Sequence, residues 1–206
     1  MKSKFFNSWK KVIKTNKNKI INSKIIGKVD RGNNDEKLSV LDAEIETNKG
    51  DRLSRAIILE SPSVVVVPVL KLLNKKKFIV IKQFRISQGK ETIEFPAGAI
   101  KNNQKIQSAL DEIKEEINIK INKKDLKKLH NRPIMMMPSY NSCLAYFYYF
   151  EKNVDNNTLN KLNNSITGQR NLGEKIKVKV IDEDKIKKIN TSSVVIGLSL
   201  YERLKK

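Results

Sequence analysis

The sequence predicts an α+β sandwich rather than a doubly wound parallel sheet. The first observation is that strand-like runs come in consecutive pairs joined by short polar connections, as hairpins do. The second is that the helical patterns are few and alternate irregularly with the strands. The third is one amphipathic helix that follows a strand through a short turn of small residues. Regular βαβ units would alternate strand and helix throughout.

The N-terminal region is expected to be a helix followed by strands. The helix carries Phe5, Phe6 and Trp9, and two strands flank a turn at residues 48–51, whose Asn and Gly suit a positive φ. No acidic residue precedes Asp30, so a mitochondrial presequence stays open as an alternative. The scarcity of arginine in this segment favours a helix of the mature fold.

The remaining elements follow the hydrophobic pattern. A valine-rich strand at residues 63–70 and a strand at residues 77–84 form a pair, and a further strand runs into Pro96. The amphipathic helix begins near Lys105, with Asn103 as its cap. Beyond it we expect strands near residues 134–137, 144–150 and 173–181, a polar helix at 156–163 and a closing helix at 192–204.

The composition excludes several classes of protein. In 206 residues with 39% hydrophobic side chains, no apolar run approaches the ~20 residues that cross a bilayer, so we expect a soluble protein without a membrane partner. A single cysteine, Cys143, excludes an intramolecular disulfide and fits a reducing compartment. A single histidine, His130, excludes a His-rich zinc site. The expected compartment is the cytoplasm, with a mitochondrion or another organelle as the alternative.

The net charge of +20 does not by itself indicate a nucleic-acid-binding protein. Seven of the 42 basic residues are Arg, and the lysines are spread along the chain. Nucleic-acid surfaces instead cluster their basic residues and use Arg for bidentate contacts. Because lysine, asparagine and isoleucine are all frequent, an AT-rich coding bias explains the charge equally well. Nucleic acid is therefore an alternative partner and not the favoured one.

The amphipathic helix carries an acidic cluster beside its apolar stripe. Glu112, Glu115 and Glu116 follow at i, i+3 and i+4, so they lie together on the helix surface. Each like-charge i,i+4 pair costs an isolated helix ~0.2–0.5 kcal/mol. A divalent cation with oxygen ligands explains the cluster, and so does a solvated acidic face. The stripe that faces the core is Ile106, Ala109, Leu110, Ile113 and Ile117.

The segment from residue 94 to residue 119 resembles a Nudix box, G-x5-E-x7-R-E-U-x-E-E-x-G-U. Residues 111–119, DEIKEEINI, take the places of R-E-U-x-E-E-x-G-U, and Gly98 takes that of the opening glycine. The sequence departs from the box at three places. The loop is one residue short, so the first Glu falls on Asn103 or Gln104; Asp111 replaces the Arg; and Asn118 replaces the second Gly.

Flanking motifs extend the resemblance to the ADP-ribose and ADP-sugar pyrophosphatases within the Nudix hydrolases. EFPAG at residues 94–98 is similar to their E-L-P-A-G, and Gln83-Phe84-Arg85 to their Q-x-R. Residues 138–143 resemble P-S-x-G-x-C, and residues 167–178 resemble T-G-x-R-x-x-G-E-x-I-x-V. The resemblance implies an α+β fold of the Nudix type, an α/β/α sandwich with a mixed central sheet and an N-terminal antiparallel strand region.

The activity that this resemblance implies is metal-dependent hydrolysis of the pyrophosphate bond of an ADP-sugar or ADP-ribose. The products are a nucleoside monophosphate and a sugar phosphate. It implies Mg²⁺ or Mn²⁺ held by Glu112, Glu115, Glu116 and the carbonyl of Ala97, with the three glutamates catalytic. It also implies that Arg85 contacts the diphosphate and Glu94 the base or ribose.

The resemblance further implies a homodimer in which residues 1–62, the N-terminal helix and strand region, form much of the contact. The hydrolase domain is then expected at residues 63–206.

Relatives often carry a carboxylate in a loop after the box, whereas residues 141–146 contain none. Losing a positioned base costs ~10²–10⁴ in rate. Two alternatives therefore stay open: a catalytically impaired Nudix-fold subunit that binds RNA or an assembly, and a hydrolase of another pyrophosphate, including capped RNA.

Overall fold

The computed structural model describes residues 3–30, 36–73, 75–168 and 175–204. The chain divides into two compact units. The N-terminal unit comprises Met1–Pro62 together with Ile134–Leu144, and the main unit comprises Ser63–Pro133 and Ala145–Lys206. No helix in the described segments is long and apolar enough to cross a membrane.

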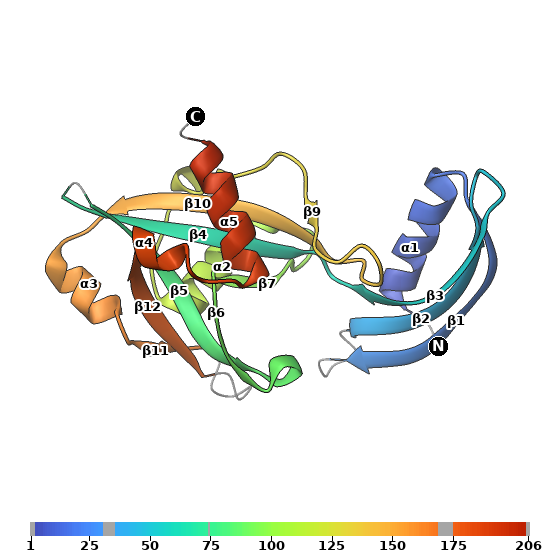
Figure 1. Ribbon diagram of the computed structural model, residues 1–206, viewed down its shortest axis with the longest axis horizontal. Helices are drawn as coiled ribbons and strands as arrows, with labels where there is room; N and C mark the ends of the chain where they lie inside the picture. The colour runs from blue at the N-terminus through green and yellow to red at the C-terminus, as the bar shows by residue number, and fades with distance from the viewer. Residues whose placement is uncertain (1–2, 31–35, 74, 169–174, 205–206) are drawn as a thin grey trace. The chain divides into compact units, whose positions relative to one another are not determined.

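In the N-terminal unit, one helix packs on a three-stranded antiparallel sheet (Figure 1). The elements are α1 (Lys4–Thr15), β1 (Lys19–Asp30), β2 (Glu36–Glu46), β3 (Arg52–Glu60) and the short β9 (Ile134–Met135). Phe6 and Trp9 of α1 stack on each other and contact the buried Leu41 and Leu59 of the sheet. The helix, its aromatic face and the strand pair of the N-terminal region were predicted.

The segment at residues 134–144 joins the N-terminal unit through β3. The main-chain nitrogen of Ile58 donates to the carbonyl of Tyr140 (2.7 Å), and the nitrogen of Ser142 donates to the carbonyl of Ile58 (2.9 Å). The side-chain amide of Asn141 donates to Glu60 (2.7 Å). These bonds join residues about eighty positions apart in the chain, so hydrophobic periodicity gives no sign of them.

The main unit is built on a mixed sheet, which confirms the predicted α+β class. The strand order is β11-β12-β5-β4-β10-β8, with β6 paired to β5 and β7 paired to β4. β10 runs parallel to β4, and the other pairs along this path are antiparallel. The strands are β4 (Ser63–Leu72), β5 (Lys75–Arg85), β6 (Lys90–Glu94), β7 (Ala97–Ala99), β8 (Lys127–Lys128), β10 (Leu144–Asn153), β11 (Ile166–Thr167) and β12 (Ile176–Asp182).

Helices cover both faces of this sheet (Figure 1). The helical segments are η1 (Ile86–Gln88), α2 (Lys105–Ile117), η2 (Lys123–Asp125), α3 (Asn156–Leu162), α4 (Glu183–Ile186) and α5 (Ser192–Arg203). Because side chains alternate along a strand, Val64 and Val66 of β4 enter the core under α2, whereas Val67 meets Gly197 of α5. The predicted stripe of α2 is buried at Ala109, Ile113 and Ile117 and partly buried at Ile106 and Leu110.

The segment from β6 to β7, which lies between β4 and β5 where these two strands separate, positions the α2 helix. Residues 69–72 of β4 pair with residues 75–78 of β5, and beyond this point β5 pairs with β6 while β4 pairs with β7. Phe95 and Pro96, both buried, connect β6 to β7, and the carbonyl of Pro96 accepts a hydrogen bond from the nitrogen of Val66 (2.9 Å). The small residues after Pro96 are therefore fixed directly beneath α2.

One local prediction is wrong. Asn103 was expected to cap α2, but the N-cap is Gln104, which makes no side-chain capping bond, and Asn103 has φ +58°. The strand expected near residues 134–137 is present but only two residues long. At the other end of α2, Asn118 stands in the place of the second Gly of the box and ends the helix in the left-handed conformation (φ +52°), which Asn tolerates. Residues 169–174 of the tail motif lie outside the described residues.

Gly197→Ala is expected to destabilise the protein. The new Cβ would lie 2.9 Å from Cγ2 of Val67 and 3.0 Å from a ring carbon of Phe95. Overpacking costs about 1–3 kcal/mol, and Ala recovers about 1 kcal/mol of helix propensity over Gly, so the free energy of unfolding should fall by up to about 2 kcal/mol in urea titrations. Ser199→Ala, on the exposed side of the same helix, is the control and should not lose stability.

Candidate active site

Glu112 lies directly against the small-residue bend that follows Pro96. A Cβ built on Gly98 would be 2.0 Å from Oε1 of Glu112 and 2.6 Å from its Oε2. Only glycine leaves room for this carboxylate, which explains the glycine that opens the box. Glu112 is 8% exposed, so its carboxylate is held in a largely buried position over the main chain.

Glu116, one turn later, reaches the same bend. The main-chain nitrogen of Ala97 donates to Oε2 of Glu116 (2.9 Å), and Glu116 is 6% exposed. The hydroxyl of Thr167 donates to the main-chain oxygen of Glu116 (2.5 Å), which ties the end of α2 to β11. The structure therefore brings together three of the predicted site residues, namely Ala97, Glu112 and Glu116.

Glu115 is placed differently. It is partly exposed, and its main-chain oxygen accepts a hydrogen bond from the nitrogen of Gly168 (3.4 Å). Within the described residues, no three His, Cys, Asp or Glu side chains form a group that could hold a metal ion. The predicted metal set of three glutamates and the Ala97 carbonyl therefore stays a prediction.

The donor set at the bend nevertheless fits a divalent cation. Glu112 and Glu116 present carboxylate oxygens, the ligand type that Mg²⁺ and Mn²⁺ prefer. Both glutamates are more than nine-tenths buried, and the electrostatic attraction between a carboxylate and a nearby cation is stronger there than in water. Gly98 keeps the space beside Glu112 free of a side chain.

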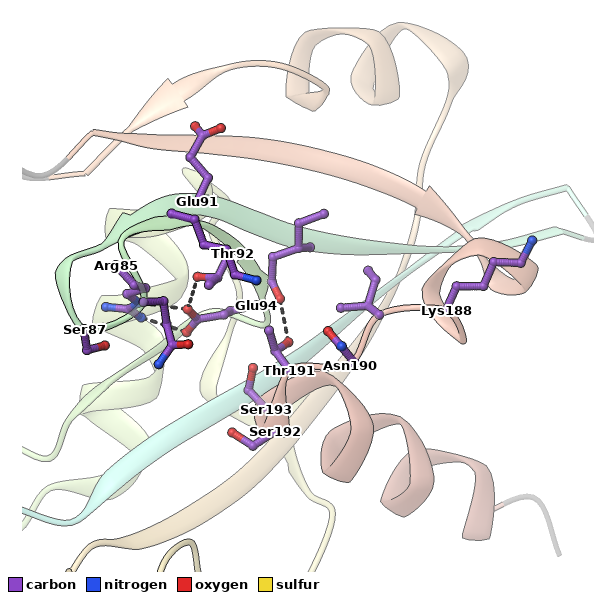
Figure 2. A pocket seen from close by; sticks show the side chains of 14 residues that line it. Arg85, Ser87, Glu91, Thr92, Glu94, Lys188, Asn190, Thr191, Ser192 and Ser193 are labelled. Atoms are coloured by element: carbon purple, nitrogen blue, oxygen red, sulfur yellow. Dashed lines mark hydrogen bonds and ion pairs between the residues drawn. The ribbon is translucent and has the colours of Figure 1, made fainter.

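Arg85 and Glu94, predicted to contact different parts of a substrate, form an ion pair with each other (Figure 2). Nε of Arg85 donates to Oε1 of Glu94 (2.8 Å) and Nη2 donates to Oε2 (2.7 Å). The hydroxyl of Thr92 also donates to Oε1 (2.5 Å). Glu94 pairs in register with Ile81, whose side chain lies in the core under α2, so Glu94 points to the α2 face of the sheet.

This ion pair lies in a cavity of about 820 Å³ along β6 and the α4–α5 connection. Polar groups of the connection bind the strand edge. The hydroxyl of Thr191 donates to the carbonyl of Ile93 (2.5 Å), and the hydroxyl of Ser193 accepts from the nitrogen of Phe95 (3.2 Å). Sequence patterns did not indicate these contacts, because they join residues 98 positions apart.

The pKa of Glu94 is below its ordinary value. Burial by itself raises the pKa, but the hydrogen bonds from Arg85 and Thr92 and the charge of Arg85 outweigh that effect. A carboxyl whose folded-state pKa is lowered contributes stability above its unfolded-state pKa of about 4.3 and loses that contribution as the pH falls through the folded-state value.

Arg85→Met should therefore destabilise the protein in a pH-dependent way. The Arg85 side chain is 41% exposed, so solvent screens the ion pair and weakens it. We therefore expect the free energy of unfolding to fall by about 1–2 kcal/mol near pH 7. The difference from wild type should shrink below about pH 4, where Glu94 becomes protonated in both proteins. Urea titrations at several pH values measure it, and a difference that grows toward low pH would contradict the assignment.

The loop after the box contributes no acid in the structure either. Asn141, Ser142 and Cys143 belong to the N-terminal unit and bind its main chain. The nitrogen of Cys143 donates to the side-chain oxygen of Asn141 (2.6 Å), and the hydroxyl of Ser142 accepts from the nitrogen of Glu60 (3.2 Å). These side chains serve the packing of the loop on β3.

The chain resembles known proteins in both sequence and fold. It is 27% identical over 164 residues to Nudix hydrolase 14, chloroplastic, of Arabidopsis thaliana, a match that covers 74% of this chain. The match covers 53% of that relative, so the chain spans about half its length. No family model matches the chain.

Among solved structures, the crystal structure of an ADP compounds hydrolase superposes with a TM-score of 0.62 at 16% identity. The superposition covers 91% of this chain and 93% of that one. Because the superposition covers nearly all of both chains, the likeness extends over the whole fold described above. The chain is therefore similar in sequence to a Nudix hydrolase, and its fold is that of an ADP compounds hydrolase.

Proposed function

We propose that the protein is a metal-dependent hydrolase of the pyrophosphate bond of nucleoside diphosphate sugars, with ADP-ribose or an ADP-sugar as substrate. One observation carries the proposal: the carboxylates of Glu112 and Glu116 converge on the main chain at Gly98 and Ala97. The relatives point in the same direction, since one is a Nudix hydrolase and another an ADP compounds hydrolase.

Each residue of the candidate site has a proposed role. Glu112 and Glu116 hold Mg²⁺ or Mn²⁺, with Glu115 and the carbonyl of Ala97 completing the ligand set. A bound cation of this kind neutralises phosphate charge and lowers the pKa of a coordinated water. Because the loop after the box has no acid, Glu115, the most exposed of the three glutamates, is the residue we assign to orient the attacking water.

The ion pair of Arg85 and Glu94 supports the proposed substrate contacts. A guanidinium that holds a carboxylate in two hydrogen bonds can hold a phosphate in the same way, since both partners present paired oxygens. We propose that Arg85 exchanges part of its contact with Glu94 for the diphosphate. Glu94 then accepts a hydrogen bond from the base or ribose.

A substrate panel tests the proposal. Purified protein is incubated with ADP-ribose, ADP-glucose, other nucleoside diphosphate sugars and capped RNA, with Mg²⁺, with Mn²⁺ or with a chelator. We expect a nucleoside monophosphate and a sugar phosphate to form from an ADP compound only when metal is present. Absence of turnover over the whole panel with either metal would refute the hydrolase proposal.

The second candidate is a Nudix-fold subunit without catalysis. Two observations favour it, namely Asp111 in place of the cationic residue of the box and the loop at residues 141–143 without an acid. Polyanion binding that falls steeply with salt, together with an inert substrate panel, would support this alternative.

We also propose a homodimer with residues 1–62 in the interface, and a cytoplasmic location. The N-terminal unit carries an apolar cavity of about 290 Å³ whose lining includes Trp9, Ile13 and Ile57. Light scattering at micromolar concentration should give twice the chain mass of 23.7 kDa, and a monomer would refute the dimer. The name of the Arabidopsis thaliana relative describes a chloroplastic protein, so an organelle remains the alternative location.

A further inference from the structure

The cavity along β6 holds charged groups that the proposed roles of Arg85 and Glu94 do not use. Its two acidic side chains are already in ion pairs: Glu91 with Lys82 (2.5 Å) and Glu94 with Arg85. Its remaining cations, Lys90 and Lys188, form no ion pair with any described residue. The lining therefore has a surplus of positive charge that suits an anionic ligand.

Uncharged polar side chains in the same lining suit a ligand with hydroxyl groups. The side chains of Ser87, Gln88, Asn190 and Ser192 line the cavity and form no hydrogen bond with another described residue. Hydroxyl and amide groups both donate and accept hydrogen bonds, as sugar hydroxyls do. None of the described lining residues is aromatic, so the cavity offers no ring on which a base could stack.

The shape of the cavity suits a ligand longer than a phosphate ion. Figure 2 shows the Arg85–Glu94 pair at one end of the lining and Lys188 at the other, with Thr191 between them. The volume of about 820 Å³ lies within the ~300–1,000 Å³ range of small-molecule sites. Two hydrogen bonds join the walls of the cavity, one donated by Thr191 to the strand edge and one accepted by Ser193 from it.

We propose that this cavity is a binding site for a sugar phosphate, with Lys188 at its phosphate group and the side chains of Ser87, Gln88 and Asn190 at its hydroxyls. Such a ligand has two sources: the sugar phosphate half of a substrate, or a free sugar phosphate that binds as a product or a regulator. The recognition chemistry is the same for both.

Binding of glucose 1-phosphate and ribose 5-phosphate to the full chain tests the site without requiring turnover. Isothermal titration or ligand-observed NMR is carried out on wild type and on Lys188→Gln, with Lys187→Gln as the matched control. Lys187 is the adjacent exposed lysine, does not line the cavity and pairs with Glu202 (3.7 Å). We expect binding to wild type and to Lys187→Gln, and a roughly three- to tenfold weaker affinity in Lys188→Gln from loss of a charge-assisted contact. Lys90→Gln should weaken binding in the same direction.

Three results would overturn the site: no binding of either sugar phosphate, equal affinity in Lys188→Gln and Lys187→Gln, or inorganic phosphate binding as tightly as the sugar phosphates. The two sources are separated by kinetics on an ADP-sugar. Competitive inhibition by the sugar phosphate, with a raised KM in Lys188→Gln, identifies the substrate half. Inhibition or activation that is not competitive identifies a separate ligand. A protein that binds sugar phosphates but hydrolyses nothing would retain this site and lose the proposed function.

Discussion

Gly98→Ala is expected to abolish most of the proposed hydrolase activity while leaving the fold intact. The new methyl group would occupy the place of the Glu112 carboxylate, whose nearest oxygen lies 2.0 Å from the position that the added Cβ would take. Because this carboxylate ends a flexible side chain, it can turn away, so the cost to stability should stay near ~1 kcal/mol, the scale of an ordinary substitution. Displacing a catalytic group by about 1 Å costs about 10² in rate, and we expect at least that loss in kcat/KM.

The matched control for this variant is Gly27→Ala. Among the described residues, a Cβ at Gly27 meets only Val40, at 3.8 Å, which is ordinary van der Waals contact. Thermal melts and ADP-ribose hydrolysis are measured for both variants, together with Mn²⁺ binding by electron paramagnetic resonance. Gly27→Ala should match wild type in all three measurements. A Gly98→Ala protein that binds Mn²⁺ and turns over like wild type would show that the position of Glu112 does not matter for the chemistry.

The α2 helix could be predicted from the sequence because its information is local. The spacing of Ala109, Ile113 and Ile117 fixes which side is buried, and the same periodicity places Glu112 and Glu116 together on the adjoining side. The resemblance to the Nudix box then gives the glycine that the carboxylate needs. The long strands β4, β5, β10 and β12 are predictable for the same reason, since alternation or a continuous apolar run marks each one. The two- and three-residue strands β7, β8 and β11 carry no such pattern and were not predicted.

The contacts of the cavity could not be predicted in this way. Arg85 pairs in register with Lys90, so its distance along the strand to Glu94 is four residues, or about 13 Å, which only a long side chain bridges. A pattern of cross-strand neighbours would instead place Arg85 beside Lys90. The contribution of Thr191 and Ser193 depends on how α5 packs on the sheet, which is a tertiary property without a sequence period.

The packing of the loop at residues 134–144 could not be predicted from the sequence either. Its sequence resembles a family motif, and a motif describes neighbours along the chain rather than the unit in which they pack. Asn141 and Ser142 use their polar groups to bind β3 of the N-terminal unit. A segment can therefore keep Pro138 and Cys143 of a motif while its polar side chains take a structural role. Under the proposed function, the catalytic carboxylate must therefore come from α2.

Glu116→Gln is accordingly expected to lose at least about 10² in kcat/KM, the usual scale for removing one charged group that stabilises a transition state. The variant is nearly isosteric, and its amide oxygen can still accept the hydrogen bond from the nitrogen of Ala97, so the melting temperature should change little. The carboxylate charge, and not the packing of the side chain, is what the substitution removes. Mn²⁺ affinity should fall with the rate, because one of two buried oxygen ligands becomes neutral.

Asp111→Asn is the control that separates this effect from a general loss of acidity on α2. Asp111 lies on the same helix but accepts a hydrogen bond from the side-chain nitrogen of Gln107 (2.8 Å), one turn earlier. An asparagine oxygen preserves that bond, so both the rate and the Mn²⁺ affinity should stay within about twofold of wild type, as for other surface changes. If the two variants lose activity and metal affinity equally, the helix acts through its total charge. Unequal losses require the two glutamates at the bend to act as individual ligands.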